Sequence, residues 1–176
     1  GFDETLSGIV AWNREMDFEA RRKEAWHFLF QGYAVYDYLD FTIATEDPLG
    51  VGAVEYPFGQ YYDGTVMRRY LAQLKRFFDG LPLESMKPDP QVDCTKSLVA
   101  RIDALSSPGR CYALYIEGNS LKQLRLALPQ GNYHAVWVDP RQGEEKLAMR
   151  LTAGETGCIL PVPVYEQDIA LRIDRI

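Results

Sequence analysis

Two patterns of apolar residues divide the chain. In the first half, apolar side chains recur every three or four positions over residues 17–31 and 65–79, as they do on one face of a helix. In the second half they recur at every second position, and Gly, Asn or Pro separates the runs. The pattern predicts helices followed by an antiparallel sheet.

The first predicted helix, residues 17–31, carries signals at both ends. Asp17 is an N-cap candidate, and Gly32 suits a C-cap. The residues that fall on its packing face are Phe18, Arg22, Ala25, Trp26 and Leu29. The pattern therefore predicts a helix that packs through Trp26 and Leu29.

The second predicted helix, residues 65–79, has the clearest apolar stripe and ends at Gly80. The stripe consists of Met67, Tyr70, Leu71, Leu74, Phe77 and Phe78. Other parts of the protein must cover it, either within this chain or in another copy.

Between these helices the periodicity changes twice. Residues 33–43 alternate between apolar and polar positions and predict one strand, whereas 42–64 show no period and predict a long loop. Loops of this length within a compact domain often carry function.

Four later runs alternate with period two, at residues 112–116, 124–128, 147–151 and 169–173. They predict a C-terminal antiparallel β-sandwich. Three prolines in PLESMKPDP mark a connection, so we place the domain boundary near residues 81–97, with a helical segment over 1–90 and the sandwich over 91–176. The expected fold class is α+β, with the helical segment packed on the sandwich.

Composition excludes several functions. The net charge is -6 and there is no dense basic cluster, so we expect no nucleic-acid partner. No apolar stretch is long enough to span a membrane, and we expect no membrane partner. The three cysteines are scattered and predict buried thiols. The sequence contains no phosphate-binding loop or metal-ligand spacing, so we expect no cofactor and no metal.

Candidate chemistry comes from acidic residues beside aromatic ones, concentrated in YAVYDYLDF and YPFGQYYDG. Carboxylates can act in glycoside hydrolysis, and aromatic rings offer flat apolar faces to the C–H faces of sugars. The combination favours carbohydrate as a partner.

The segments FDETLSG, EARRKEAWHFLFQGYAVYDYLDFTIATEDPLG and MRRYLAQLKRFFDGLPLESMKPDP resemble the C-terminal end of the catalytic (β/α)8 barrel in bacterial glycoside hydrolases of the cellulase-like superfamily. The segments YALYIEG, LRLALPQGNYHAVWVDPRQGE and DIALRI resemble the small β-sandwich that follows those barrels, a module often named after collagen binding.

The resemblance implies a position for each barrel element. Glu4 would stand at the end of the seventh strand, where the family keeps its nucleophile, and 33–41 would be the eighth strand. Loop 42–64 would lie on the substrate side, with Glu46 and Asp47 as candidates for binding sugar hydroxyls.

The family's general acid/base follows the fourth strand, and the chain has no counterpart of that region. Glycoside hydrolysis needs two carboxyl groups. We therefore expect the chain to be unable to hydrolyse glycosides alone, and whether it belongs to an active enzyme stays open. The resemblance also implies a missing N-terminal barrel portion and an exported, extracytoplasmic bacterial protein.

Three hypotheses remain. The first is the C-terminal portion of a glycoside-hydrolase-like protein, in which the sandwich is a structural or accessory module. The second is a stand-alone carbohydrate-binding module, with Tyr56, Tyr61 and Tyr62 as a stacking surface. The third is an interaction domain that forms a homo-oligomer through the stripe of helix 65–79.

Overall fold

The computed structural model describes Glu4 and Thr5 and residues 17–33, 35–38, 54–55, 61–62, 65–118 and 121–176. These residues form two α-helices and mostly antiparallel strands, which confirms the predicted α+β class. Contacts within the chain define two compact units, one made of Gly1–Leu29 and Tyr33–Ala72 and the other of Phe30–Gly32 and Gln73–Ile176. The predicted boundary near residues 81–97 stays a prediction.

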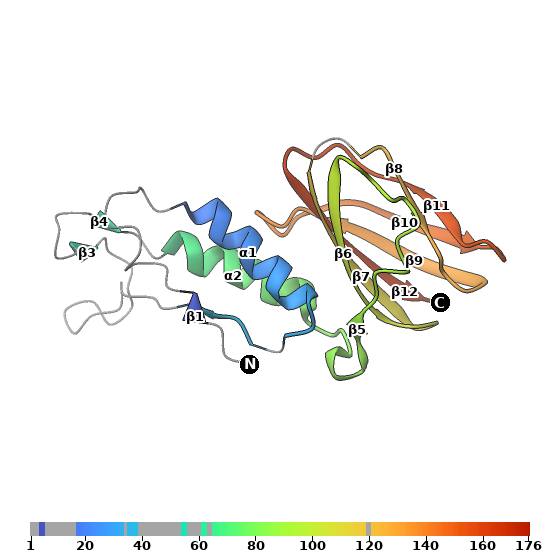
Figure 1. Ribbon diagram of the computed structural model, residues 1–176, viewed down its shortest axis with the longest axis horizontal. Coiled ribbons are helices and arrows are strands. Elements are labelled where there is room, and N and C mark those ends of the chain that lie inside the picture. Colours follow the sequence, from blue (N-terminus) through green and yellow to red (C-terminus); the bar gives the residue numbers. More distant parts are fainter. Residues whose placement is uncertain are drawn as a thin grey trace. The chain divides into compact units, whose positions relative to one another are not determined.

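The first unit contains short strands and most of the helical residues (Figure 1). Its elements are β1 (Glu4–Thr5), α1 (Phe18–Phe30), β2 (Asp37–Tyr38), β3 (Val54–Glu55), β4 (Tyr61–Tyr62) and the first part of α2 (Thr65–Phe78). β1 pairs with β2 in parallel, and β3 pairs with β4 antiparallel. The β3–β4 pair was not predicted, because residues 44–64 have no period-two pattern.

Helix α1 ends where its caps predict. An oxygen of the Asp17 carboxylate accepts the N–H of Ala20 at 2.9 Å, and Gly32 takes a φ of 85°. Ala25 and Trp26 are buried as predicted, whereas Leu29 is only half-buried. Leu29 therefore packs in part, and Trp26 packs fully.

The strand predicted over 33–43 begins later than predicted, at Asp37. Tyr33 and Val35 are exposed and lie outside β2. The Tyr33 ring stacks on Phe28 of α1, with ring centroids 4.4 Å apart. This local contact holds Tyr33 against α1. Residues 39–43 lie outside the described part of the chain.

Helix α2 confirms the stripe predicted for residues 65–79. Its buried residues are Met67, Leu74, Phe77 and Phe78, and Gly80 follows with a φ of 79°. Tyr70 and Leu71 are half-buried.

The second unit is built on a six-stranded antiparallel sheet with the order β10-β9-β12-β7-β6-β5. Its strands are β5 (Lys87–Pro88), β6 (Ala100–Ser107), β7 (Cys111–Gly118), β9 (Gly131–Val138), β10 (Glu145–Ala153) and β12 (Asp168–Arg175). A smaller antiparallel sheet pairs β8 (Gln123–Leu126) with β11 (Cys158–Pro161). A single 3-10 turn, η1 (Leu83–Ser85), precedes β5. Three of the four predicted period-two runs, 112–116, 147–151 and 169–173, lie within strands, whereas the run 124–128 begins in β8 and continues past its end at Leu126 (Figure 1).

The core of this unit lies between its two sheets. Leu124, Leu126 and Leu160 from the small sheet belong to one buried cluster with Trp137 and Leu171 from the large sheet. Each such side chain contributes about 1.5–3 kcal/mol when it is fully buried. Burial of this cluster stabilises the second unit.

Strand β7 is buried on both faces, although its sequence alternates. Leu114 and Ile116 point into the cluster between the sheets, and Tyr115 on the opposite face is also fully buried. The rings of Phe30 and Tyr115 lie 6.0 Å apart, and Phe30 also contacts Phe77 and Phe78. The last residues of the two helices therefore cover the second face of β7.

Candidate functional site

The candidate nucleophile Glu4 lies in β1, beside β2. The register pairs Glu4 with Asp37 and Thr5 with Tyr38 in parallel. α1 lies between these strands in sequence, and α2 follows β2. A strand, a helix and a parallel neighbouring strand form the repeating unit of a (β/α)8 barrel. The strands predicted to be neighbours in such a barrel are therefore neighbours.

The other predicted binding residues are placed less completely. Tyr61 and Tyr62 form β4, where Tyr62 pairs with Val54 and Tyr61 with Glu55. Glu46, Asp47 and Tyr56 lie outside the described residues. The roles of all five residues in substrate binding stay predictions.

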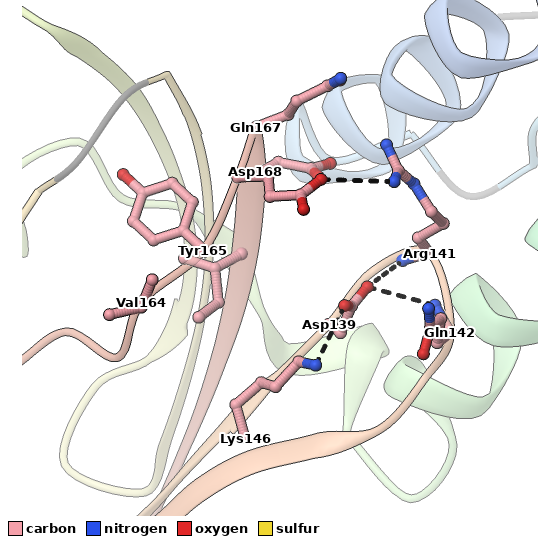
Figure 2. A pocket seen from close by; sticks show the side chains of 10 residues that line it. Asp139, Arg141, Gln142, Lys146, Val164, Tyr165, Gln167 and Asp168 are labelled. Carbon is pink, nitrogen blue, oxygen red and sulfur yellow. Dashed lines mark hydrogen bonds and ion pairs between the residues drawn. The ribbon is translucent and has the colours of Figure 1, made fainter.

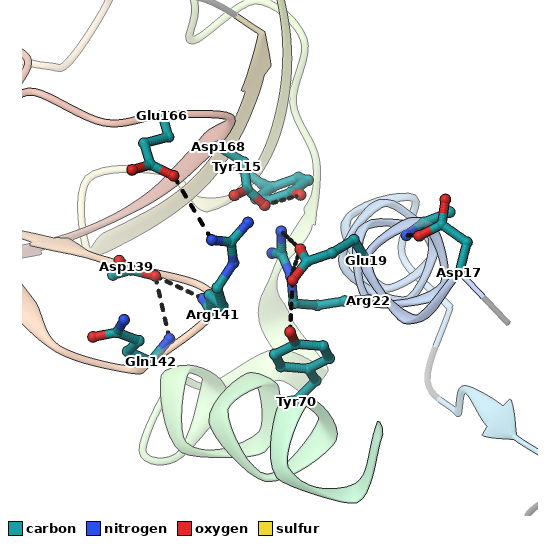
Figure 3. Close-up of polar contacts among 11 residues, drawn as sticks. Asp17, Glu19, Arg22, Tyr70, Tyr115, Asp139, Arg141, Gln142, Glu166 and Asp168 are labelled. Carbon is teal, nitrogen blue, oxygen red and sulfur yellow. Dashed lines mark hydrogen bonds and ion pairs between the residues drawn. The ribbon is translucent and has the colours of Figure 1, made fainter. Parts of the chain in front are cut away.

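A buried ionic network in the first unit was not predicted. Arg22 of α1 is only 1% exposed, and it donates through Nε and Nη2 to an oxygen of Glu19 at 3.1 and 3.0 Å. The Tyr70 hydroxyl of α2 donates to the other Glu19 oxygen at 2.6 Å, as Figure 3 shows. The Arg22 guanidinium also lies 5.6 Å from the centre of the Tyr70 ring. Glu19 thus neutralises a buried cation within α1. The contacts of Tyr70 with Glu19 and Arg22 connect α1 to α2.

A polar cavity of about 300 Å³ lies in the second unit. One wall is the connection between β9 and β10, and the other is the segment that leads into β12. Residues that line it include Asp139, Arg141, Gln142, Lys146, Tyr165 and Asp168 (Figure 2). Sequence reasoning identified DPRQG only as a turn, because its cavity partners lie more than twenty positions further along the chain.

Two acidic groups near this cavity have hydrogen-bond or ion-pair partners, and one of them is buried. Tyr115 donates its hydroxyl to the Asp168 carboxylate at 2.5 Å, and both side chains are buried. The half-buried Arg141 lies 3.8 Å from the exposed Glu166 (Figure 3). Burial raises the pKa of the nearby Tyr165 hydroxyl, which accepts the N–H of Leu121 at 3.2 Å.

A second cavity, of about 290 Å³, lies between the last turns of α2 and the outer face of β9 and β12. Phe77, Val136 and Val138 form its apolar part. The Gln73 side-chain oxygen is buried and accepts no hydrogen bond from the residues that the structure describes. Arg172 is held at its edge by Asp174, at 3.0 Å, and by the carbonyl of Asp79, at 2.9 Å.

The thiols differ in their surroundings. Burial raises the pKa of Cys158 to about 11, and burial also raises the pKa of Cys111. Cys94 is exposed, so the expectation of three buried thiols was wrong for this residue. The described residues contain no group of His, Cys, Asp and Glu suited to a metal ion. They also include no helix with the length and apolar character required to span a membrane.

No sequence family matches the chain, and no curated protein matches it. Its fold is shared by solved structures. One is a glycoside hydrolase family 5 protein from Bacteroides vulgatus ATCC 8482, with a TM-score of 0.67 and 15% identity over 93% of this chain. Another is described as a glycoside hydrolase, with a TM-score of 0.62 and 14% identity over 96% of this chain.

The chain spans 37% and 39% of the lengths of those two proteins. The resemblance to glycoside hydrolases is thereby confirmed at the level of the fold. The assignment of the C-terminal sheets to the module named after collagen binding stays a prediction. The chain has the fold of part of a glycoside hydrolase.

Proposed function

We propose that this chain is the C-terminal portion of a glycoside-hydrolase-like protein. The observation that carries the proposal is the parallel pairing of β1 with β2, with α1 between them in sequence and Glu4 in register with Asp37. The shared fold with parts of two glycoside hydrolases supports it. In this proposal, the second unit is a structural or accessory module.

Glu4 is the proposed nucleophile. In a retaining mechanism, one carboxylate attacks the anomeric carbon while a second carboxyl group, about 5 Å away, protonates the leaving oxygen. The resemblance places that second group after a fourth barrel strand, for which this chain has no counterpart. Glu46, Asp47 and the tyrosines Tyr56, Tyr61 and Tyr62 are proposed to contact the sugar.

The proposal predicts that the isolated chain does not hydrolyse glycosides. Reducing ends released from a panel of polysaccharides should match those of a buffer blank for both the 176-residue chain and its Glu4→Gln variant. Release by the chain that Glu4→Gln abolishes would show a complete active site and contradict the proposal. The coding sequence upstream supplies a second test: it should encode further strand-helix repeats, with a catalytic carboxylate after the fourth strand.

A stand-alone carbohydrate-binding module is the second candidate function. The polar cavity of the second unit favours it, because ligand binding there would need no barrel. Affinity electrophoresis in gels that contain soluble polysaccharides tests it. The migration of the chain should be retarded, and unchanged migration in every gel would reject binding.

Two further parts of the proposal concern assembly and location. A homo-oligomer would show a mass above 20.1 kDa in light scattering, and a strict monomer would reject it. An extracytoplasmic location rests on the resemblance alone, and fractionation of the source cells tests it.

A further inference from the structure

The polar cavity of the second unit has a rigid wall. The Asp139 carboxylate accepts the N–H groups of Arg141 and Gln142 at 2.8 and 3.2 Å, and the Asp139 carbonyl accepts the N–H of Gly143 at 2.7 Å. Gly143 has a φ of 72°, which favours glycine. These bonds hold the connection in one conformation, so binding there would require little ordering of the chain.

The opposite wall is also fixed to the sheet. The carbonyl of Gln167 accepts the N–H of Gly118 at 2.9 Å, and the Tyr165 hydroxyl accepts the N–H of Leu121. Asp168 begins β12 and is held by Tyr115. The backbone of both walls is therefore held in place before any ligand arrives.

Lys146 reaches the cavity from an irregularity in β10. The register between β10 and β9 shifts between Glu145 and Leu147, which places Lys146 at a β-bulge. Bulges redirect side chains and are frequent beside functional sites. Lys146 lines the cavity and lies 3.4 Å from Asp139 (Figure 2).

The lining offers both donors and acceptors of hydrogen bonds. Arg141 and Lys146 donate, and the carboxylates of Asp139 and Glu166 accept. Gln142 and Gln167 can do both. A sugar hydroxyl is likewise both a donor and an acceptor, so a polyol can satisfy a mixed lining of this kind.

The charges favour a neutral ligand. Lys146 lies beside Asp139 and Arg141 beside Glu166, so each cation has a carboxylate within 3.8 Å. Asp168 adds a third carboxylate to the lining. With three carboxylates and two cations, the cavity would repel phosphate or a uronic acid more than it would a neutral hydroxyl compound.

Apolar surface lies beside these polar groups. Tyr165 is half-buried in the lining, and Val164 next to it is 97% exposed. Figure 2 shows both side chains on the side of the cavity opposite Arg141. An aromatic ring with an exposed apolar neighbour offers a contact for the C–H face of a sugar ring.

We propose that this cavity is a binding site for a neutral saccharide. The choice of ligand class rests on the proposed function, whereas the place of the site rests on the cavity itself. It would give the second unit the role of holding a glycan chain, independent of Glu4.

Isothermal titration of the 176-residue chain with cellohexaose, xylohexaose and mannohexaose tests the proposal, with trigalacturonate and inorganic phosphate as anionic probes. At least one neutral hexasaccharide should bind. Gln142→Ala combined with Gln167→Ala should weaken that binding about tenfold or more, because two exposed amides of the lining are lost.

Matched controls lie on the exposed side of β8 and next to it. Gln123→Ala should leave the affinity unchanged, since Gln123 is exposed and outside the lining. Lys146→Ala should weaken binding, and Lys122→Ala should not. Thermal unfolding identifies folded variants, and the lysine pair decides the question if the double glutamine variant does not fold.

Three results would overturn the proposal: no neutral hexasaccharide binds, the cavity variants bind as well as the controls, or only the anionic probes bind. Failure of the proposed function would give a different set of results. Saccharide binding together with hydrolysis that does not depend on Glu4 would reject the role of Glu4 and keep the site. In the protein as its gene encodes it, with any residues that precede Gly1, hydrolysis that depends on Glu4 without cavity binding would reject the site alone.

Discussion

At the scale of single residues, Arg22 places a charge in the interior of the first unit. Its guanidinium is 1% exposed, and Glu19 accepts two of its N–H groups. Removing one partner of a buried ion pair costs much more than removing an exposed one, since it leaves a desolvated charge.

Two substitutions in α1 test this contrast. Glu19→Ala should lower the free energy of unfolding by about 2 kcal/mol, less than for a fully buried pair because the Glu19 side chain is 33% exposed. Glu24→Ala removes the exposed Arg21–Glu24 pair and should change the free energy of unfolding by less than about 0.5 kcal/mol. Urea titrations of both variants supply the comparison, and equal losses would show that the Arg22 network stabilises the protein no more than an exposed ion pair does.

Cys158 should make stability depend on alkaline pH. Burial raises its pKa from 9.0 to about 11, so the unfolded chain loses this proton at lower pH than the folded chain does. The contribution of the protonated Cys158 thiol to the free energy of unfolding is complete below pH 9 and is lost as the pH rises towards 11.

The comparison of wild type with Cys158→Ala isolates this contribution. Under reducing conditions, the free energy of unfolding of the wild type should fall more between pH 8 and pH 10 than that of the variant, because the variant lacks the thiol. Parallel pH profiles would mean that Cys158 ionises alike in both states.

At the scale of elements, a tight turn before β11 depends on one glycine. Gly154 and Gly157 exchange two backbone hydrogen bonds, at 3.0 and 3.1 Å. Gly157 has a φ of 86°, and a Cβ there would collide with the carbonyl oxygen of Leu126. A Cβ at Gly154, by contrast, would have no atom within 4 Å.

Alanine at these two sites should therefore have different effects. Gly157→Ala should cost about 2–4 kcal/mol through strain and displacement of β8, whereas Gly154→Ala should stay within about 0.5 kcal/mol. Thermal unfolding of both variants measures the difference. A tolerated Gly157→Ala would show that the turn can relax away from Leu126.

The elements that the sequence predicted well are the ones with local causes. Asp17 and Gly32 cap α1 through neighbouring backbone groups, and the strands of the second unit follow their alternation. Burial of Tyr115 was not predictable in this way, since it depends on Phe30, which is distant in sequence. Arg22 likewise has an acidic neighbour in its own helix, but its ring contact comes from Tyr70.

The same distinction between local and long-range causes applies to the candidate site. Glu4 came from a resemblance, and the structure adds its parallel partner Asp37. The polar cavity was not predictable, because it combines residues 139–146 with residues 164–169, and only the pairing of β12 with β9 brings these segments together. No short motif encodes that proximity.

At the scale of the whole molecule, the fold is that of somewhat more than a third of a glycoside hydrolase. The proposed division of labour assigns the nucleophile to β1 in the first unit and glycan holding to the cavity of the second. Because the two functions use different residues, loss of one should leave the other measurable.

The measurement that tests this account most directly is hydrolysis by the protein as its gene encodes it, with any residues that precede Gly1. Glu4→Gln should lower kcat about a thousandfold or more, because the covalent step loses its nucleophile, and leave saccharide binding intact. Glu24→Gln, an exposed change on α1, should keep full activity. Undiminished hydrolysis by the Glu4→Gln protein would contradict the account.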